Sequence, residues 1–354
     1  MLFVDVAIIV RWASEPVEIV SQVARRRLRR AIVQRLAAIT FVFLSCTILT
    51  TLARCDESDS EPAIAATVNG DPILVSEVER ELQIAIGERE IDAGAKPYFQ
   101  AKTLAQLIDR RLIIQWLRAT GRGASDSELD LEISRLEKRL QSRDITLADH
   151  LASRQITAPE MRRLLEWQVG WRKFLALYLT DENLEKYFND HRREFDGTRM
   201  HVAHILLRVD SDDASGVKQA VRRATEIGES IAAGAISFEE AAKRHSAAPT
   251  SANGGDIAFI ERHKPMHEAF SRAAFALNEK EVSPPVITPF GVHLVRCIEI
   301  EPGQRTWQDA RDELTTAVTL YLFNWAAQKE RPKAEIRFTK ALPHFAVGSE
   351  ELAE

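Results

Sequence analysis

Apolar residues recur at helical spacing throughout residues 76–190. They return every three or four positions in three stretches: Leu104, Leu107, Ile108, Leu112 and Ile113; Leu129, Ile133, Leu136 and Leu140; and Leu164, Leu165 and Trp171. This spacing places each group on one face of a helix. We therefore expect about four or five helices, which form either a scaffold or a cradle whose apolar grooves hold extended chains.

Capping boxes mark three of the expected helix starts. In this device a Ser or Thr hydroxyl accepts from the backbone amide three positions on, and a Glu at that position bonds back. The pairs are Ser76 and Glu79, Ser125 and Glu128, and Thr157 and Glu160. Before the first of them, Asn69-Gly70 predicts a tight turn between two short extended pieces.

The pattern changes between residues 198 and 300. Residues 199–207 alternate and then become continuously apolar, which predicts a central strand. Two helices, a Gly-rich loop and a short helix are expected next, at about 216–233, from Ser237, at 251–256, and around Met266, Phe270 and Phe275. A last strand over 292–300 completes a compact α+β domain.

An uncharged segment near the N-terminus predicts a membrane anchor. Residues 36–53 contain no charged side chain, and 18 residues of helix span roughly 27 Å, close to the hydrocarbon thickness of a bilayer. A core helix would show a polar face instead. Arginines cluster between Arg25 and Arg35, so the positive-inside rule places the N-terminus in the cytoplasm and the rest of the chain outside.

The fate of that segment has three alternatives. It stays as a transmembrane anchor, is cleaved as a signal peptide, or ends in a lipidated Cys55. Residues 52–55 resemble a bacterial lipobox, but Arg54 stands where a small residue is usual. Residues 56–66 are acidic and contain Pro62, which is typical of a solvated linker.

Composition excludes several classes of protein. The 354 residues carry a net charge of -5 and only 3 cysteines, too few for a disulfide scaffold or a cysteine-built metal site. Eight arginines face three acidic residues in 1–55, so the remainder is acidic and nucleic acid is not expected as a partner. His263 and His267 have helical spacing, but Pro265 lies between them and no carboxylate set surrounds them, which disfavours zinc.

Six motifs between 199 and 300 occur in the order and spacing of the parvulin (PpiC-type rotamase) peptidyl-prolyl isomerases, which this region resembles. They are His204-Ile205-Leu206-Leu207, Ser246-x-x-Pro249-x-Ser251-Ala252-x-Gly254-Gly255-Asp256-Ile257, Met266-x-x-x-Phe270, Phe275-x-Leu277, Pro285-Val286-x-Thr288 and Phe290-Gly291-x-His293. The flanks at 68–70 and 306–338 resemble, more weakly, exported folding factors of the SurA and PrsA type.

The resemblance implies a site without metal or cofactor. Its apolar part, which holds the proline ring, corresponds to Ile257, Met266, Phe270 and Phe290, and its polar part to His204, Thr288 and His293. Without the family resemblance, the Met and Phe residues could equally be ordinary core packing, and each His could be a core residue whose hydrogen bonds are satisfied. Ala248 stands where the active family has an acid or Cys, and Ala258 replaces a usual Gly, so turnover is in question while proline binding is not.

Together these observations predict an α+β protein: a parvulin-like domain with a small antiparallel sheet, inserted between an N-terminal helical chaperone region and a C-terminal helix. The expected parts are a basic segment and anchor (1–55), a linker (56–66), a helical chaperone region (67–196), the isomerase domain (197–301), a C-terminal helix and strand that pack on the N-terminal region (302–345) and an acidic tail (346–354).

The predicted function is isomerisation of X-Pro bonds, and chaperone activity, in unfolded or partly folded proteins of the bacterial envelope, on its periplasmic or extracytoplasmic side. The alternative is a weak or inactive parvulin-fold holdase that binds unfolded chains. A structural scaffold of the envelope is a third hypothesis, which only the anchor favours.

Overall fold

The computed structural model describes residues 62–353 except 88, 210–213, 264–265 and 347–351. The predicted anchor, Cys55 and most of the linker lie outside these residues. Within the described part of the chain, no helix is both long and apolar enough to cross a bilayer. The described residues divide into two compact units, one formed by 175–322 and the other by 62–174 and 323–353.

The first unit to be described, 62–174 with 323–353, contains a three-stranded antiparallel sheet in the order β2-β1-β7. The strands are β1 (Ile64–Val68), β2 (Asp71–Leu74) and β7 (Ile336–Phe338). The β1–β2 turn is formed by Asn69 and Gly70, with φ of 52° and 84°, so the predicted Asn-Gly turn is confirmed. The Asn69 side chain also accepts from the backbone amide of Glu335 at 2.8 Å, which fixes the chain entering β7.

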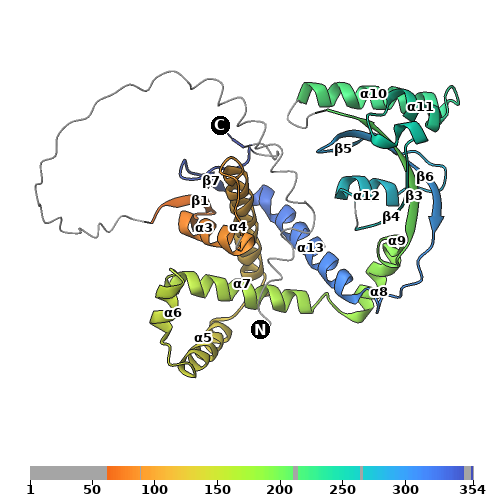
Figure 1. Ribbon diagram of the computed structural model, residues 1–354. Helices are drawn as coiled ribbons and strands as arrows, with labels where there is room; N and C mark the ends of the chain where they lie inside the picture. Colours follow the sequence, from red (N-terminus) through yellow and green to blue (C-terminus); the bar gives the residue numbers. More distant parts are fainter. Residues whose placement is uncertain (1–61, 88, 210–213, 264–265, 347–351, 354) are drawn as a thin grey trace, which may run out of the picture. The chain divides into compact units, whose positions relative to one another are not determined.

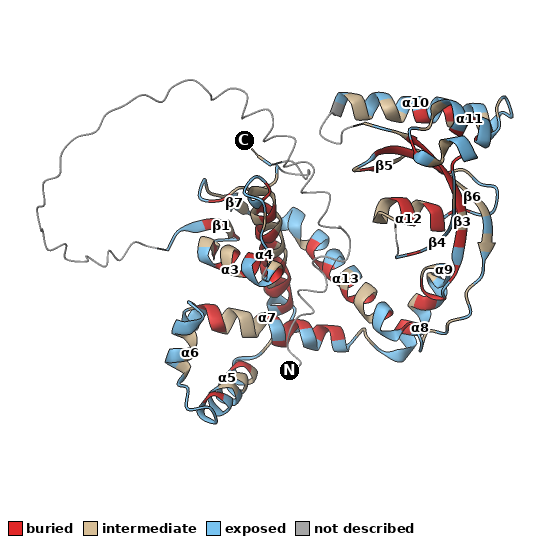
Figure 2. Ribbon diagram, viewed as in Figure 1, coloured by how far each residue is buried: buried red, intermediate tan, exposed pale blue. Residues whose placement is uncertain are grey.

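The helices of this unit are α3 (Val75–Ile86), α4 (Lys96–Ala119), α5 (Asp126–Gln141), α6 (Leu147–Ser153), α7 (Ala158–Ala176), the C-terminal part of α13 (Arg311–Glu330) and the short η2 (Arg331–Lys333). Of these, α3 and α4 form the apolar core together with the sheet. The predicted apolar stripe of α4 is buried, with Leu104 and Ile108 in contact with the sheet core. In Figure 2, α4 is mostly buried, whereas α5 and α6 are largely exposed.

Six described helices (α3 to α7, and α8 in the other unit) lie between residues 75 and 190, rather than four or five, because 126–153 forms two short helices. The Ser76 capping box is wrong. Strand β2 leads directly into α3, so Leu74 is the N-cap, and Glu77 accepts from the Leu74 backbone amide. The boxes at Ser125 and Thr157 are confirmed.

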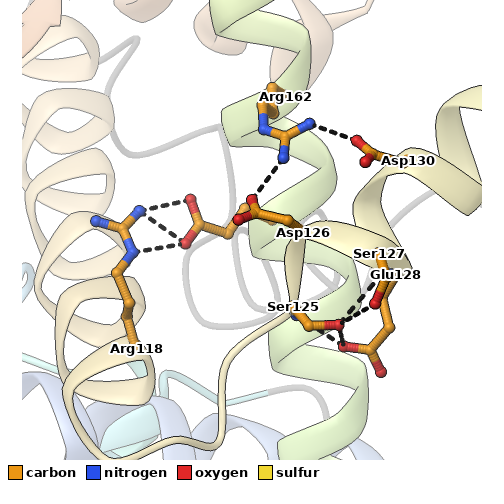
Figure 3. A network of polar contacts seen from close by, with 8 residues as sticks. Arg118, Ser125, Asp126, Ser127, Glu128, Asp130 and Arg162 are labelled. Atoms are coloured by element: carbon orange, nitrogen blue, oxygen red, sulfur yellow. Dashed lines mark hydrogen bonds and ion pairs between the residues drawn. The ribbon is translucent and has the colours of Figure 1, made fainter.

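Polar contacts link α7 to α4 on one side and to α5 on the other (Figure 3). The Arg118 guanidinium of α4 makes a bidentate bond to Glu166 of α7, with distances of 2.7 Å from Nη2 to both carboxylate oxygens. Arg162 of α7 bonds Asp126 at 2.6 Å and Asp130 at 2.9 Å, both at the start of α5. Since these side chains are exposed, they fix orientation more than they add stability.

The second unit, 175–322, is built on a four-stranded antiparallel sheet in the order β4-β3-β6-β5 (Figure 1). The strands are β3 (Arg199–Leu207), β4 (Asp256–Glu261), β5 (Val286–Thr288) and β6 (Gly291–Glu301). The helices are α8 (Asp181–Asp190), α9 (Arg192–Phe195), α10 (Ala214–Ala232), α11 (Phe238–His245), η1 (Pro249–Asn253), α12 (Glu268–Phe275) and the N-terminal part of α13. The predicted α+β class with small antiparallel sheets is confirmed.

Alternation along β3 and β6 gives this sheet two apolar faces. Met200 and Val202 pack on the side of α12 together with Phe270. Ala203 and Ile205 pack on the other side, in a core that includes Ala224 of α10 and Phe238 of α11. His204 on β3 and His293 on β6 therefore lie on the α12 side, between side chains of the apolar core on that side.

Candidate active site

His204 and His293 meet on the α12 side of the sheet. In the β3–β6 register His204 pairs with Val295 and His293 with Leu206, so the two histidines are diagonal neighbours on one face. Their Nδ1 atoms lie 3.3 Å apart, and their rings are stacked at 26°. Both side chains are buried, with exposed fractions of 8% and 4%.

Thr288 extends this pair into a chain of hydrogen bonds. Its Oγ1 lies 2.8 Å from Nε2 of His293, faces the Gly291 carbonyl at 3.3 Å and accepts from the Phe290 amide at 3.2 Å. Only one proton fits between the two Nδ1 atoms, since one must donate and the other accept. If Thr288 donates to His293, then His293 donates to His204. If Thr288 donates to Gly291, the direction is reversed.

Both imidazoles are neutral near pH 7. Burial is the main cause that lowers the pKa of His293 to about 4, and the nearby His204 and His267 add to the effect. Burial also lowers the pKa of His204. A charged imidazolium would lose most of its hydration here, and no carboxylate hydrogen-bonds either ring within the described residues.

Phe270 forms the apolar wall of the site. Its ring meets both imidazoles edge-on, with centroid distances of 5.7 Å to His204 and 5.4 Å to His293. Met266 and Ile257 are half-buried against the same core. Met266 precedes α12 rather than lying on it, because His267 is the N-cap and its Nδ1 accepts from the Ala269 amide.

A loop tied to the end of β3 carries Ala248. The Ser246 hydroxyl accepts from the backbone amides of Leu206 (3.1 Å) and Ala248 (3.2 Å), and the Ala247 amide donates to the Leu206 carbonyl at 2.7 Å. Ala248 is buried and brings a methyl group, with no titratable atom, to this position. Ser246 lies in a motif already noted in the sequence, but its role as a backbone tie was missed.

The return of this loop requires a glycine. Gly255 has a φ of +84°, and a Cβ there would lie 2.3 Å from the His204 carbonyl oxygen. The His204 amide in turn donates to the Gly255 carbonyl at 2.9 Å. The close contact between the two backbones therefore fixes the position of the His204 backbone. A side chain at residue 255 would push the loop away from it.

The predicted residues occupy three kinds of position. His204, His293, Thr288 and Phe270 contact one another, and Met266 and Ile257 share their core. Phe290 is 53% exposed and reaches the site through its backbone amide. Among the described residues, no group of three or more His, Cys, Asp or Glu side chains is placed to hold a metal ion.

Comparison with known proteins agrees with this geometry. Residues 204–299 match the PPIC-type PPIase domain, and residues 22–173 match the SurA-like N-terminal domain. The chain combines a PpiC-type PPIase domain with a SurA-like N-terminal domain. The resemblance drawn from the motifs is thus confirmed for both regions, and the unit 175–322 is called the PPIase unit below, the other the SurA-like unit.

Individual relatives carry folding-factor names. The chain is 24% identical to "Foldase protein PrsA" of Bacillus subtilis over 84% of this chain and 89% of that protein. It is 35% identical to "Chaperone SurA" of Bordetella parapertussis over 33% of this chain, which spans only 21% of that protein. A solved structure of PrsA from Bacillus anthracis aligns over 65% of this chain and 96% of its own, with 19% identity and a TM-score of 0.34.

Proposed function

We propose that this protein is a peptidyl-prolyl cis–trans isomerase and folding chaperone that acts on unfolded or partly folded, proline-containing proteins. The observation that carries the isomerase part is the edge-on contact of Phe270 with both buried imidazoles, because it joins an apolar wall to a neutral polar floor. The PPIase domain match and the foldase and chaperone names of the relatives support both activities.

The chemistry needs neither nucleophile nor cofactor. Rotation about a peptide bond meets a barrier of roughly 18–20 kcal/mol, which arises from resonance across the C–N bond. X-Pro bonds isomerise slowly enough to limit folding. An apolar wall disfavours the charge-separated resonance form and favours the twisted amide, so rotation is accelerated while every covalent bond stays intact.

Each residue has a distinct part in this proposal. Phe270, Met266 and Ile257 hold the proline ring. The hydrogen-bonded series Thr288, His293 and His204 fixes the floor of the pocket, and its neutrality keeps a full charge away from the amide. Support for these parts comes from their mutual contacts and their burial.

Ala248 favours a second candidate, a holdase that binds proline segments with little turnover. A buried methyl group stands where active relatives of this fold have an acid or Cys, and the Ser246 tie leaves that part of the loop little freedom. Since the proline-holding residues are retained, binding is expected to survive even if the rate is low.

We further propose that the protein works outside the cytoplasm in the bacterial envelope, held by residues 36–53 or by a lipidated Cys55, or released after cleavage. The uncharged segment that follows an arginine cluster supports this location. A reporter enzyme that works only outside the cytoplasm should be active when it is fused after Glu61. A reporter active only in the cytoplasm would contradict export.

The two activities are separable by one substitution. Phe270→Leu keeps an apolar, branched side chain at this position but removes the ring that faces the histidines. It should weaken proline-peptide binding severalfold, since an aromatic contact contributes about 0.5–1.5 kcal/mol, and should leave suppression of aggregation of an unfolded test protein unchanged. Phe259→Leu on β4 removes a half-exposed ring of the same unit and serves as the control. Equal binding by both variants would contradict the proposed pocket.

A further inference from the structure

The PPIase unit has a cavity between α10 and α11. Its volume is about 280 Å³, and its lining comes from the middle of α10, the connection after it and the last turn of α11. The residues that matter here are Arg223, Glu226, Ile227, Ile236, Arg244 and His245. None of them belongs to the proline site.

This cavity lies on the opposite side of the sheet from the histidine pair. Ile227 and Ile236 belong to or pack on the core beneath α10 and α11, whereas Phe270 belongs to the core beneath α12. The four-stranded sheet separates the two cores. A ligand in the α10–α11 cavity therefore cannot be the proline that contacts Phe270.

The rim of the cavity carries unbalanced positive charge. Arg223 is paired with Glu226 at 3.1 Å, but within the described chain no hydrogen bond or ion pair reaches the exposed Arg244 guanidinium. The pKa of His245 is lowered, first by burial and then by the charges of Arg223 and Arg244. Both guanidinium groups therefore act on the same small space, and together they offer more cationic charge than Glu226 neutralises.

The lining of the cavity also includes apolar side chains. Two of them, the buried Ile227 and the half-buried Ile236, are called the floor of the cavity here. A free, hydrated oxyanion would gain nothing from these side chains, and it would leave most of the volume empty. A carboxylate attached to an apolar side chain would satisfy both parts, since the guanidinium binds the carboxylate and the floor takes the apolar group.

We infer that the α10–α11 cavity binds an acidic peptide segment, with a carboxylate at Arg244 and Arg223 and a neighbouring apolar side chain on Ile227 and Ile236. This inference rests on the proposed function, because the segment would belong to a client chain. Two attachment points on one unit would raise the effective concentration of the client's proline at the histidine site.

The test uses the full-length chain and a fluorescent, proline-free peptide of alternating Leu and Asp. Arg244→Glu should weaken binding at least about tenfold, because it removes a charge-assisted bond and adds repulsion. Lys243→Glu makes the same charge change one residue earlier on α11, outside the lining, and should change binding less than about twofold. A peptide with Asn in place of Asp should bind as weakly as the Arg244→Glu variant binds the acidic one.

Versions of the peptide with a free and an amidated C-terminus show whether a terminal or a side-chain carboxylate is taken. The inference is overturned if the wild type does not bind the acidic peptide, if both variants lose affinity equally, or if only inorganic phosphate binds at Arg244. Prolyl isomerisation is measured on the same samples. A wild type that binds the acidic peptide but neither binds nor isomerises proline peptides would refute the proposed function and leave the cavity assignment intact.

Discussion

The histidine site of the PPIase unit and the helix contacts of the SurA-like unit bury polar groups of opposite character. In the PPIase unit the buried site consists of neutral groups, His204, His293 and Thr288, that share hydrogen bonds. In the SurA-like unit the buried polar groups are ion pairs that join α3 to α4 and α7: Arg111 with Glu77, Arg110 with Glu81, and Arg80 with Glu160. One set of buried polar groups is therefore neutral and hydrogen-bonded, and the other consists of paired charges.

The difference indicates what each set is for. Burial raises the pKa of Glu77 even though Arg111, Arg163 and Arg80 counteract it, so the Glu77 carboxylate is held at a desolvation cost, and its pair with Arg111 fixes α3 against α4. A neutral set costs less to bury and presents no full charge to a bound amide. Of these two sets, the neutral one is better suited to lie beside a neutral, apolar group such as proline.

The largest expected effect comes from removing one partner of a buried ion pair. Arg111→Ala leaves Glu77 without its nearest cation and should lower the free energy of unfolding of the SurA-like unit by about 3–5 kcal/mol. Urea unfolding followed by fluorescence of the tryptophans on α4 and α7 measures this. Arg135→Ala, on an exposed pair of α5, should cost less than about 1 kcal/mol. Equal losses of unfolding free energy in the two variants would show that the buried ion pair contributes no more to stability than the exposed one.

The neutral histidines predict an acid-sensitive PPIase unit. The pKa of His293 is about 4 in the fold against 6.5 for an ordinary histidine, so the unfolded chain takes up the proton first as pH falls. Stability is full above about 6.5 and decreases toward pH 4, by about 3 kcal/mol in total for this residue. Hydrogen exchange of the β3 and β6 amides against pH measures the loss. His293→Gln should reduce the dependence of stability on pH. An unchanged dependence would mean that His293 is not held neutral in the folded protein.

The weakest effect is expected at a strained position within β4. Ala258 has a φ of +61°, a conformation that costs a non-Gly residue about 1 kcal/mol or more. Its exposed methyl group gains little from packing, and the bond from its amide to Asp256 at 2.8 Å does not need a side chain. Ala258→Gly should raise the free energy of unfolding of the PPIase unit by roughly 0.5–1 kcal/mol. A lower stability in thermal unfolding would show that the backbone at Ala258 is unstrained.

Local patterns predicted most of the PPIase elements, because residues 199–207 alternate and then become continuously apolar, and the helices that follow keep a regular apolar spacing. The pairing of His204 with His293 came only from the family resemblance, since 89 positions separate them. The buried ion pairs were not predicted at all. Arg111 and Glu77 look like residues of solvated helix faces until tertiary packing buries both.

Two element boundaries differ from the prediction, for different reasons. The local motif predicts Ser76 as an N-cap, but the hairpin delivers the chain into α3 two residues earlier. The apolar spacing predicts Met266 on a helix that begins only after His267, because that side chain caps it. A neighbouring element sets the first boundary, whereas a local cap, which the apolar spacing does not reveal, sets the second.

We propose that the apolar, neutral site of the PPIase unit isomerises X-Pro bonds, and that it does so slowly because Ala248 supplies no acid. The most direct measurement is the isomerisation rate of a proline peptide by wild type, Ala248→Asp and the less polar Ala248→Cys, with peptide affinity measured in parallel. We expect a weak wild type and a rate at least about tenfold higher in one of the variants, which corresponds to 1.4 kcal/mol of barrier, with affinity changed only a few-fold. A fully active wild type that neither substitution alters, or three proteins that bind proline peptides without isomerising them, would contradict the account.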